Sequence, residues 1–234
     1  YDTGTFERVN LLANIAFLED FLGAGKGTFP TSATQGLDWI KKLVETGGTP
    51  SVAGVSAAGG GQVQLLIDTT SEKQEATLYW ADNKGLDVTK GLVFEARVKL
   101  TTLPSAAGAE AVWGVSSSWI DGPDNAAEYV EFGITGTGGA VNMRSQDGTT
   151  QNALASGFVA DTNFHVYRID CNVVTDIGFY VDGVRKNTAG QVGFAATGAS
   201  AILQPYLSLY KASGAGNATM VVDYVRAWMN GRES

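Results

Sequence analysis

A long succession of alternating apolar and polar residues, which begins near Gly59, most constrains the fold of this chain. In the segment GLVFEARVKL, Leu92 and Phe94 fall on one side of an extended chain, whereas Glu95 and Arg97 fall on the other. A period of two residues is typical of β-strands that are buried on one face only. The segment therefore predicts a half-buried strand, and similar segments follow it to the end of the chain.

We count about a dozen such strands, joined by short polar or glycine-rich connections. The chain lacks the crossover helices that a parallel α/β sheet needs, so two packed antiparallel sheets are the natural way to bury many one-sided strands. We predict an all-β fold with one sandwich domain over residues 15–231. Residues 1–14 are predicted to form an extended or partly helical N-terminal arm. The segment GLDWIKKLVETGG fits a strand or a helix.

The composition of the chain limits the kinds of partner that we expect it to bind. The 234 residues carry a formal net charge of −8, and only 17% of them are charged. Nucleic acids and anionic membranes attract clustered lysine and arginine, so we expect neither as a partner. A single cysteine cannot form an intrachain disulfide, and no apolar run approaches the roughly 18 residues of a membrane-spanning helix.

Three segments carry a resemblance to a known family. These are FLEDFLG (17–23), FHVYRIDCNVVTDIGFYVDGVRK (164–186) and MVVDYVRAW (220–228). Together they resemble the concanavalin A-like lectin/glucanase superfamily, and in particular the scaffold of family 16 of the glycoside hydrolases. The resemblance implies a jelly-roll sandwich. Within it, Asp182 and Gly183 are predicted to form a tight hairpin turn in which Gly183 has a positive φ.

The resemblance also implies where catalytic residues would lie. Similar glucanases carry two glutamates with an aspartate between them on one face of a strand, and this chain has AEYVEFGI at that place. Glu128 and Glu131 are three residues apart, which puts them on opposite faces of a regular strand. Neither Glu110 nor the loop SSSWIDGPDN supplies a better pair. We therefore expect no catalytic residues and predict that the chain is not an enzyme.

The only histidine, His165, is a further candidate for chemistry. Serine-nucleophile catalysis needs a base, and a zinc cluster needs more than one histidine and one cysteine. His165 shares a strand face with Tyr167, Ile169 and Cys171, a face that points into the sandwich in the resembling glucanases. We expect a partly buried histidine with a hydrogen-bond partner; contact with a ligand is the alternative.

Two kinds of binding site remain as candidates. Asp223 matches an aspartate that helps to hold a structural calcium ion in similar jelly rolls, and calcium prefers oxygen ligands. The alternative is an aspartate bonded to neighbouring main-chain amides. Trp113, Trp119 and Tyr129 are candidate glycan-binding residues, since flat aromatic rings stack on the apolar faces of sugars. The alternative for most tryptophans is the core.

Taken together, these features lead us to expect a non-catalytic structural or adhesive protein. Chains of this kind are similar to bacteriophage virion proteins, so we predict a capsid decoration protein on the virion surface or, failing that, a secreted protein. The arm (1–14) would contact a capsid protein or a second copy of the chain. The alternatives are a lectin-like carbohydrate-binding module, with a cell-surface glycan as its partner, and a family 16-type endoglucanase. We expect no cofactor apart from the candidate calcium ion.

Overall fold

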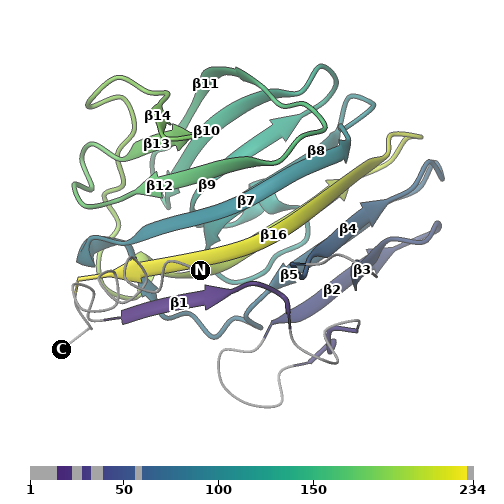
Figure 1. Cartoon of the computed structure of the whole chain (residues 1–234), viewed down its shortest axis with the longest axis horizontal. Helices are drawn as coiled ribbons and strands as arrows, with labels where there is room; N and C mark the ends of the chain where they lie inside the picture. Colours follow the sequence, from purple (N-terminus) through teal and green to yellow (C-terminus); the bar gives the residue numbers. More distant parts are fainter. Residues whose placement is uncertain (1–14, 23–27, 33–38, 56–59, 231–234) are drawn as a thin grey trace.

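The protein forms a sandwich of two antiparallel sheets in a computed structural model that describes residues 15–22, 28–32, 39–55 and 60–230 (Figure 1). The first sheet has the order β14-β13-β12-β7-β16-β4-β3, and β1 also pairs with β16. Its strands are β1 (Ile15–Glu19), β3 (Ser51–Gly54), β4 (Val63–Ile67), β7 (Val93–Thr102), β12 (His165–Asp170), β13 (Gly178–Val181), β14 (Val184–Arg185) and β16 (Ala218–Met229).

The second sheet has the order β11-β10-β9-β8-β15-β5-β2, and β6 pairs with β15. Its strands are β2 (Ile40–Glu45), β5 (Gln74–Tyr79), β6 (Leu86–Asp87), β8 (Ala109–Ser116), β9 (Glu128–Thr135), β10 (Ala140–Asp147), β11 (Gln151–Val159) and β15 (Ile202–Lys211). The described helices are three short 3₁₀ turns, η1 (Val88–Lys90), η2 (Pro123–Asn125) and η3 (Gly198–Ala201). The predicted all-β, two-sheet architecture is confirmed.

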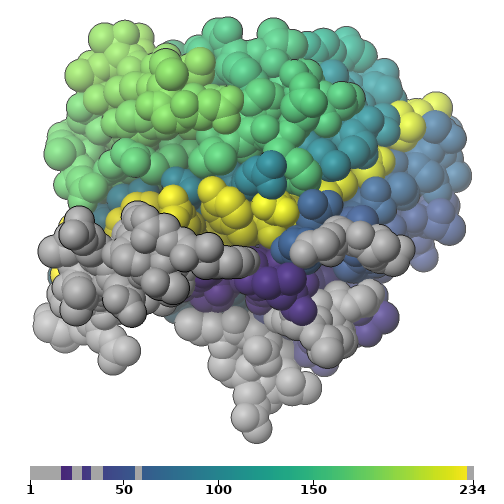
Figure 2. Space-filling view, in the orientation of Figure 1, coloured from purple at the N-terminus to yellow at the C-terminus, as the bar shows by residue number. Residues whose placement is uncertain are grey.

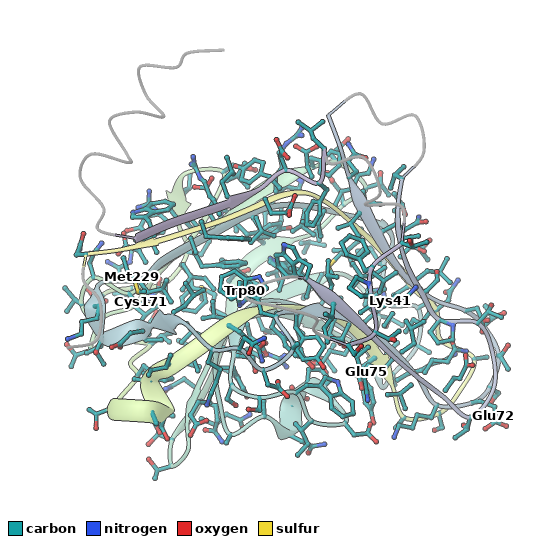
Figure 3. All side chains as sticks on the ribbon, turned by 90° about the horizontal axis from the view of Figure 1, so that it is seen from below. Lys41, Glu72, Glu75, Trp80, Cys171 and Met229 are labelled. Atoms are coloured by element: carbon teal, nitrogen blue, oxygen red, sulfur yellow. The ribbon has the colours of Figure 1, made fainter. Side chains whose placement is uncertain are left out.

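The alternation seen in the sequence decides which side chains enter the core. In β7, Phe94, Ala96 and Val98 are fully buried between the sheets, and the residues between them face outward. Trp113 of β8 stacks on Phe132 of β9 with ring centroids 6.1 Å apart. An edge-on view places Trp80 between the two layers (Figure 3). The apolar faces of the two sheets thus form one continuous core.

The long strand β16 is covered on both sides. It pairs with β7 along most of its length, while its other edge pairs with β4 over Ala218–Val222 and with β1 over Val225–Met229. Figure 2 shows β16 as a yellow band between the strands that precede it in green and β1 in purple. Two segments separated by most of the chain therefore complete the same sheet.

The ambiguous early segments are strands where the structure describes them. GLDWIKKLVETGG contributes β2, and the predicted strand entry at IAFLEDF is β1. The predicted arm (1–14) lies outside the described residues, so the domain boundary at residue 15 stays a prediction. Within the described ranges, no helix has the length and apolar character needed to cross a membrane.

Candidate active site on the outer face of the second sheet

Three buried glutamates from three strands lie on the outer face of the second sheet, the face that points away from the core. They are Glu75 of β5, Glu110 of β8 and Glu131 of β9. Their strand neighbours point into the core, so the three carboxyl groups point away from it. The exposed fractions are 0%, 4% and 1%, although carboxylates are rarely buried to this degree without a partner.

Arg144 of β10 joins two of these carboxyl groups. Its Nη1 donates to Glu110 Oε1 at 2.6 Å, and its Nη2 donates to Glu131 Oε1 at 2.5 Å. Nη1 also donates to Asp124 at 2.7 Å. The charge-assisted bonds of one planar guanidinium therefore hold two glutamates of adjacent strands close together.

Two glycines make room for this arrangement. A Cβ atom on Gly133 would lie 2.8 Å from Cζ and Nε of Arg144, so the guanidinium lies directly over that glycine. Gly114 is the β8 partner of Glu131, and a Cβ there would lie 2.6 Å from the Glu131 Cβ. Larger residues at either position would displace the Arg144–Glu131 pair.

Burial and the neighbouring charges set the protonation of the site. Burial raises the pKa of Glu131 from 4.5 to about 8 and that of Glu110 to about 7, and Arg144 opposes both shifts. Burial also raises the pKa of Glu75, against hydrogen bonds from Thr77 and Trp119. Burial by itself lowers the pKa of Arg144, but the two glutamates raise it above its ordinary value, so the guanidinium stays charged. The site thus combines a carboxyl group that is protonated near neutral pH with a fixed cation.

The connection between β8 and β9, residues 117–127, covers the site and is called the covering loop below. Trp119 Nε1 donates to Glu75 Oε1 at 2.7 Å, and the Gly122 amide donates to Glu75 Oε2 at 3.4 Å. Asp124 reaches Arg144 from the same loop. Trp119 also packs against an apolar cluster on this face, formed by Ile40, Tyr79, Val112 and Tyr206. The loop is therefore held at Glu75 and at Arg144.

Glu128 and Glu131 lie on opposite faces of β9, as predicted, but their separation did not exclude a carboxyl partner for Glu131 on a neighbouring strand. Glu128 lies on the same side of the strand as Val130, which is in the core, whereas Glu131 faces outward. We expected no partner for Glu131 because we searched along one strand and set Glu110 aside. Glu131 is paired with Gly114 of β8, the strand that also carries Glu110. Arg144 then joins the carboxyl groups of Glu110 and Glu131. The turn TGTGG, which returns the chain from β9 to β10, was the sequence signal that placed Arg144 beside Glu131.

The three aromatic candidates lie in different surroundings. Trp113 is fully buried in the core against Phe132 and Tyr167, so it offers no ring face to a glycan. Tyr129 is on the outer face but buried, and its hydroxyl accepts a hydrogen bond from Gln151 at 2.6 Å. Trp119 is half-buried in the covering loop with Lys42 Nζ 4.4 Å from its ring. Glycan binding by Tyr129 and Trp119 stays a prediction.

His165 has the surroundings that we expected. Its side chain is 16% exposed, Nδ1 lies 2.6 Å from an Asp182 oxygen, and Nε2 lies 3.1 Å from an Asp161 oxygen. Burial lowers its pKa, but the two aspartates outweigh that effect and raise it. Tyr167 and Ile169, two residues and four residues further on, lie in the core. Both ring nitrogens are therefore engaged away from the glutamate site.

Asp223 is bonded to side chains rather than to main-chain amides. Arg97 Nη1 lies 2.7 Å from Oδ2, and Gln62 Nε2 donates to Oδ1 at 3.3 Å. The described part of the chain contains no group of three or more histidine, cysteine, aspartate or glutamate residues that would hold a metal. The arginine supplies a positive charge at this carboxylate, and the calcium site stays a prediction.

Comparison with known proteins gives the fold. No family model matches the chain, and no curated protein matches its sequence. Solved structures that match include a beta-1,3-glucanase from Mycobacterium marinum (18% identity, TM-score 0.53, covering 91% of this chain and 97% of that one). A glycosyl hydrolase family protein from Mycobacterium fortuitum (17%, 0.55, 91% and 98%) and an endo-1,3-beta-glucanase from Streptomyces sioyaensis (17%, 0.54, 91% and 95%) also match. The chain has the concanavalin A-like jelly-roll fold of these proteins.

These matches correct the expected function. We predicted a non-catalytic capsid decoration protein, whereas the matching structures bear the names of glucanases and glycosyl hydrolases. We also expected Glu110 to supply no better pair, whereas Arg144 bridges Glu110 and Glu131 on one sheet face. The matches do not test the virion location or the capsid partner, and both stay predictions.

Proposed function

We propose that this chain is a glucan-hydrolysing enzyme whose catalytic carboxyl groups are those of Glu131 and Glu110. One observation carries the proposal: a single guanidinium, that of Arg144, holds two buried carboxyl groups together on one sheet face. Glycoside hydrolysis of the retaining kind needs two neighbouring carboxyl groups, one protonated and one ionised. Burial raises the pKa of both groups, and Arg144 opposes the shift in each.

Burial raises the pKa of both groups, so the site can hold a proton near neutral pH. We assign Glu131, the more deeply buried of the two, as the acid that donates its proton to the glycosidic oxygen as the C–O bond breaks. Glu110, in its ionised form, is the nucleophile that attacks the anomeric carbon. Water then cleaves the resulting ester, with Glu131 accepting a proton from that water. Arg144 keeps both groups in position and favours the ionised form of each, against the effect of burial.

The names of the matching structures support a β-glucan as the substrate, since two of them are 1,3-β-glucanases. At 17–18% identity this support comes from the fold and not from matched catalytic residues. Both carboxyl groups are buried, and Asp124 of the covering loop is bonded to the arginine that joins them. We expect a glucan chain to reach them after residues 117–127 have moved. The bonds from Trp119 to Glu75 and from Asp124 to Arg144 are those that break in this movement.

The proposal is tested by measuring the release of reducing sugar from laminarin, a soluble β-1,3-glucan. We expect Glu131→Gln and Glu110→Gln each to lower kcat by about 10² or more, because each removes a proton donor or a nucleophile. Glu128→Gln is the matched control, since it makes the same change on β9 but on the core side of the strand. It should retain near wild-type kcat.

Two outcomes contradict the proposal. One is a lack of hydrolysis by the wild type and by Trp119→Phe, in which the hydrogen bond that holds the covering loop to Glu75 is missing. The other is activity that is lost equally in the Glu128→Gln control and in the two site variants, because that pattern reports a general loss of folding.

A further inference from the structure

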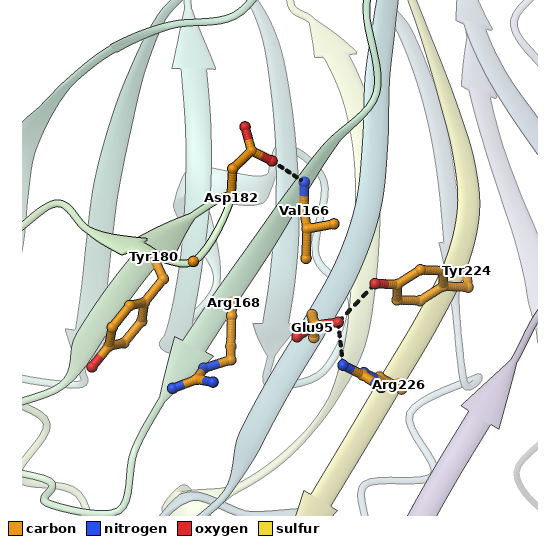
Figure 4. Close-up of a pocket in the computed structure, with 8 residues that line it drawn as sticks. Glu95, Val166, Arg168, Tyr180, Asp182, Tyr224 and Arg226 are labelled. Carbon is orange, nitrogen blue, oxygen red and sulfur yellow. Dashed lines mark hydrogen bonds and ion pairs between the residues drawn. The ribbon is translucent and has the colours of Figure 1, made fainter. Parts of the chain in front are cut away.

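A hollow lies on the outer face of the first sheet, across β7, β12, β13 and β16 (Figure 4). It has a volume of about 350 Å³, and its lining includes Glu95, Arg168, Tyr180, Asp182, Tyr224 and Arg226. We call it the arginine pocket. The candidate active site is on the other sheet, and the glutamates of that site take no part in this pocket.

Strand register brings these side chains together. Glu95 of β7 is paired with Arg168 of β12 on one side and with Arg226 of β16 on the other. Arg168 is paired in turn with Tyr180 of β13. Because all of these residues alternate with core residues in their strands, they form one row across the outer face.

The acidic groups of the pocket are already engaged. Glu95 Oε1 accepts a hydrogen bond from the Tyr224 hydroxyl at 2.7 Å and lies 2.7 Å from Arg226 Nη2. Asp182 accepts from the Val166 amide at 2.9 Å and contacts His165 at 2.6 Å (Figure 4 draws the first). Neither carboxylate needs a donor from a ligand.

Each of the two arginines has more N–H donors than bonds to described residues. A guanidinium has five N–H groups. Among the described residues, Arg168 makes one ion pair, with Asp170 at 3.2 Å, and Arg226 makes one, with Glu95. The Nε atom of each is buried and has no hydrogen-bond partner there. Partly desolvated arginines with few partners gain more from an added anionic acceptor than fully hydrated ones do.

Aromatic rings orient these arginines and flank the pocket. The Arg168 guanidinium carbon lies 4.5 Å from the centre of the Tyr180 ring, and that of Arg226 lies 5.7 Å from the Tyr224 ring. Stacking of this kind restricts a guanidinium before a ligand arrives. Tyrosine rings also provide flat apolar surface for the carbon face of a sugar.

We propose that the arginine pocket binds a carboxylate-bearing sugar residue of an acidic polysaccharide. Arg168 and Arg226 donate to the sugar carboxylate, and the tyrosine rings contact the sugar ring. The surplus of donors over free acceptors selects an anionic sugar over a neutral one. This site lies beyond the proposed function, because it binds without cleaving and uses neither Glu110 nor Glu131.

The experiment measures the affinity of the full chain for polygalacturonate, with laminarin as the neutral probe and free galacturonate as the monomeric one. We expect saturable binding of polygalacturonate to the wild type that the double variant Arg168→Gln/Arg226→Gln weakens about tenfold or more, as the loss of two charge-assisted bonds predicts. Arg185→Gln is the matched control: it removes the same charge from the same sheet, but Arg185 pairs with Asp176 outside the pocket. It should change the affinity less than twofold.

The single variant Arg168→Gln provides a second test that leaves the Glu95–Arg226 pair intact. It should weaken polygalacturonate binding without lowering laminarin hydrolysis, so a failure here is distinct from a failure of the proposed enzyme. Equal affinities in the wild type and both pocket variants overturn the proposal. So does an equal loss in Arg185→Gln, which indicates nonspecific attraction to positive charge.

Discussion

At the scale of single residues, the candidate active site depends on two glycines, because neither has a Cβ atom that would occupy the space of a neighbouring side chain. Gly133 and Gly114 lie beside Arg144 and Glu131, and in each case an added Cβ falls within 3 Å of the neighbouring side chain. Neither glycine has a positive φ, so space alone requires the absence of a side chain here. The sequence shows these residues only as glycines in strands, which often mark a close approach of another group.

We predict that Gly133→Ala destabilises the protein by about 1–3 kcal/mol, the usual cost of overpacking a buried site. The new methyl group forces Arg144 off at least one glutamate, so laminarin hydrolysis should fall as well. Gly193→Ala is the control, because its nearest contacts are 3.6 Å or longer and its φ is not positive. Urea unfolding of the three proteins measures the effect; equal stabilities would show that Arg144 moves without cost.

At the scale of elements, the strands were predictable and the covering loop was not. The hairpin at YVDGV formed as predicted, with φ of 50° at Asp182 and 79° at Gly183. Its pattern is local, since two residues in the left-handed region specify the turn. The position of the loop instead depends on bonds to Glu75, Asp82 and Arg144, each far away in the sequence. No local pattern contains that information.

We predict that Trp119→Phe loosens the covering loop. Phenylalanine keeps an aromatic ring against the apolar cluster but removes the N–H that donates to Glu75, a bond to a buried carboxyl group worth about 1–3 kcal/mol. Amide hydrogen exchange in residues 117–127 should become faster, while exchange in β7 stays slow. Trp228→Phe is the control on the opposite sheet. Unchanged exchange in the loop would show that packing, and not the hydrogen bond, holds it closed.

At the scale of the whole molecule, the sequence predicted the sandwich but not the site within it. Alternation along each strand fixes which face is buried, and that sufficed for the fold. The site combines Glu75, Glu110, Glu131 and Arg144 from four strands, so it exists only through the order and register of the second sheet. A sequence without its strand order cannot supply such a register, which is why a search along one strand missed the pair.

The buried glutamates make the stability of the whole fold depend on pH. In the folded state burial raises the pKa of Glu131 from 4.5 to about 8 and that of Glu110 to about 7. Groups with raised pKa values stabilise the fold fully below their unfolded pKa, and this contribution is lost as the pH rises through the folded values. The free energy of unfolding should therefore fall between about pH 5 and pH 8, by at least about 1.4 kcal/mol, the equivalent of one pKa unit.

Urea unfolding at several pH values measures this loss of stability. In Glu131→Gln the free energy of unfolding should depend less on pH, because the amide does not titrate. Aspartates with lowered pKa values, such as Asp68, act in the opposite sense but below this window. A stability that rises between about pH 5 and pH 8 would contradict the prediction.

The pairing of β16 with β1, β4 and β7 has a consequence for biosynthesis. A ribosome releases β16 after every other described strand of the two sheets, so the edge that β1 needs does not exist until those strands have been made. Until Ala218–Met229 emerges, the nascent first sheet has a gap at its centre, between β7 and β4. Translation that stops shortly before this segment should therefore yield a product that chaperones and proteases recognise, however complete its second sheet.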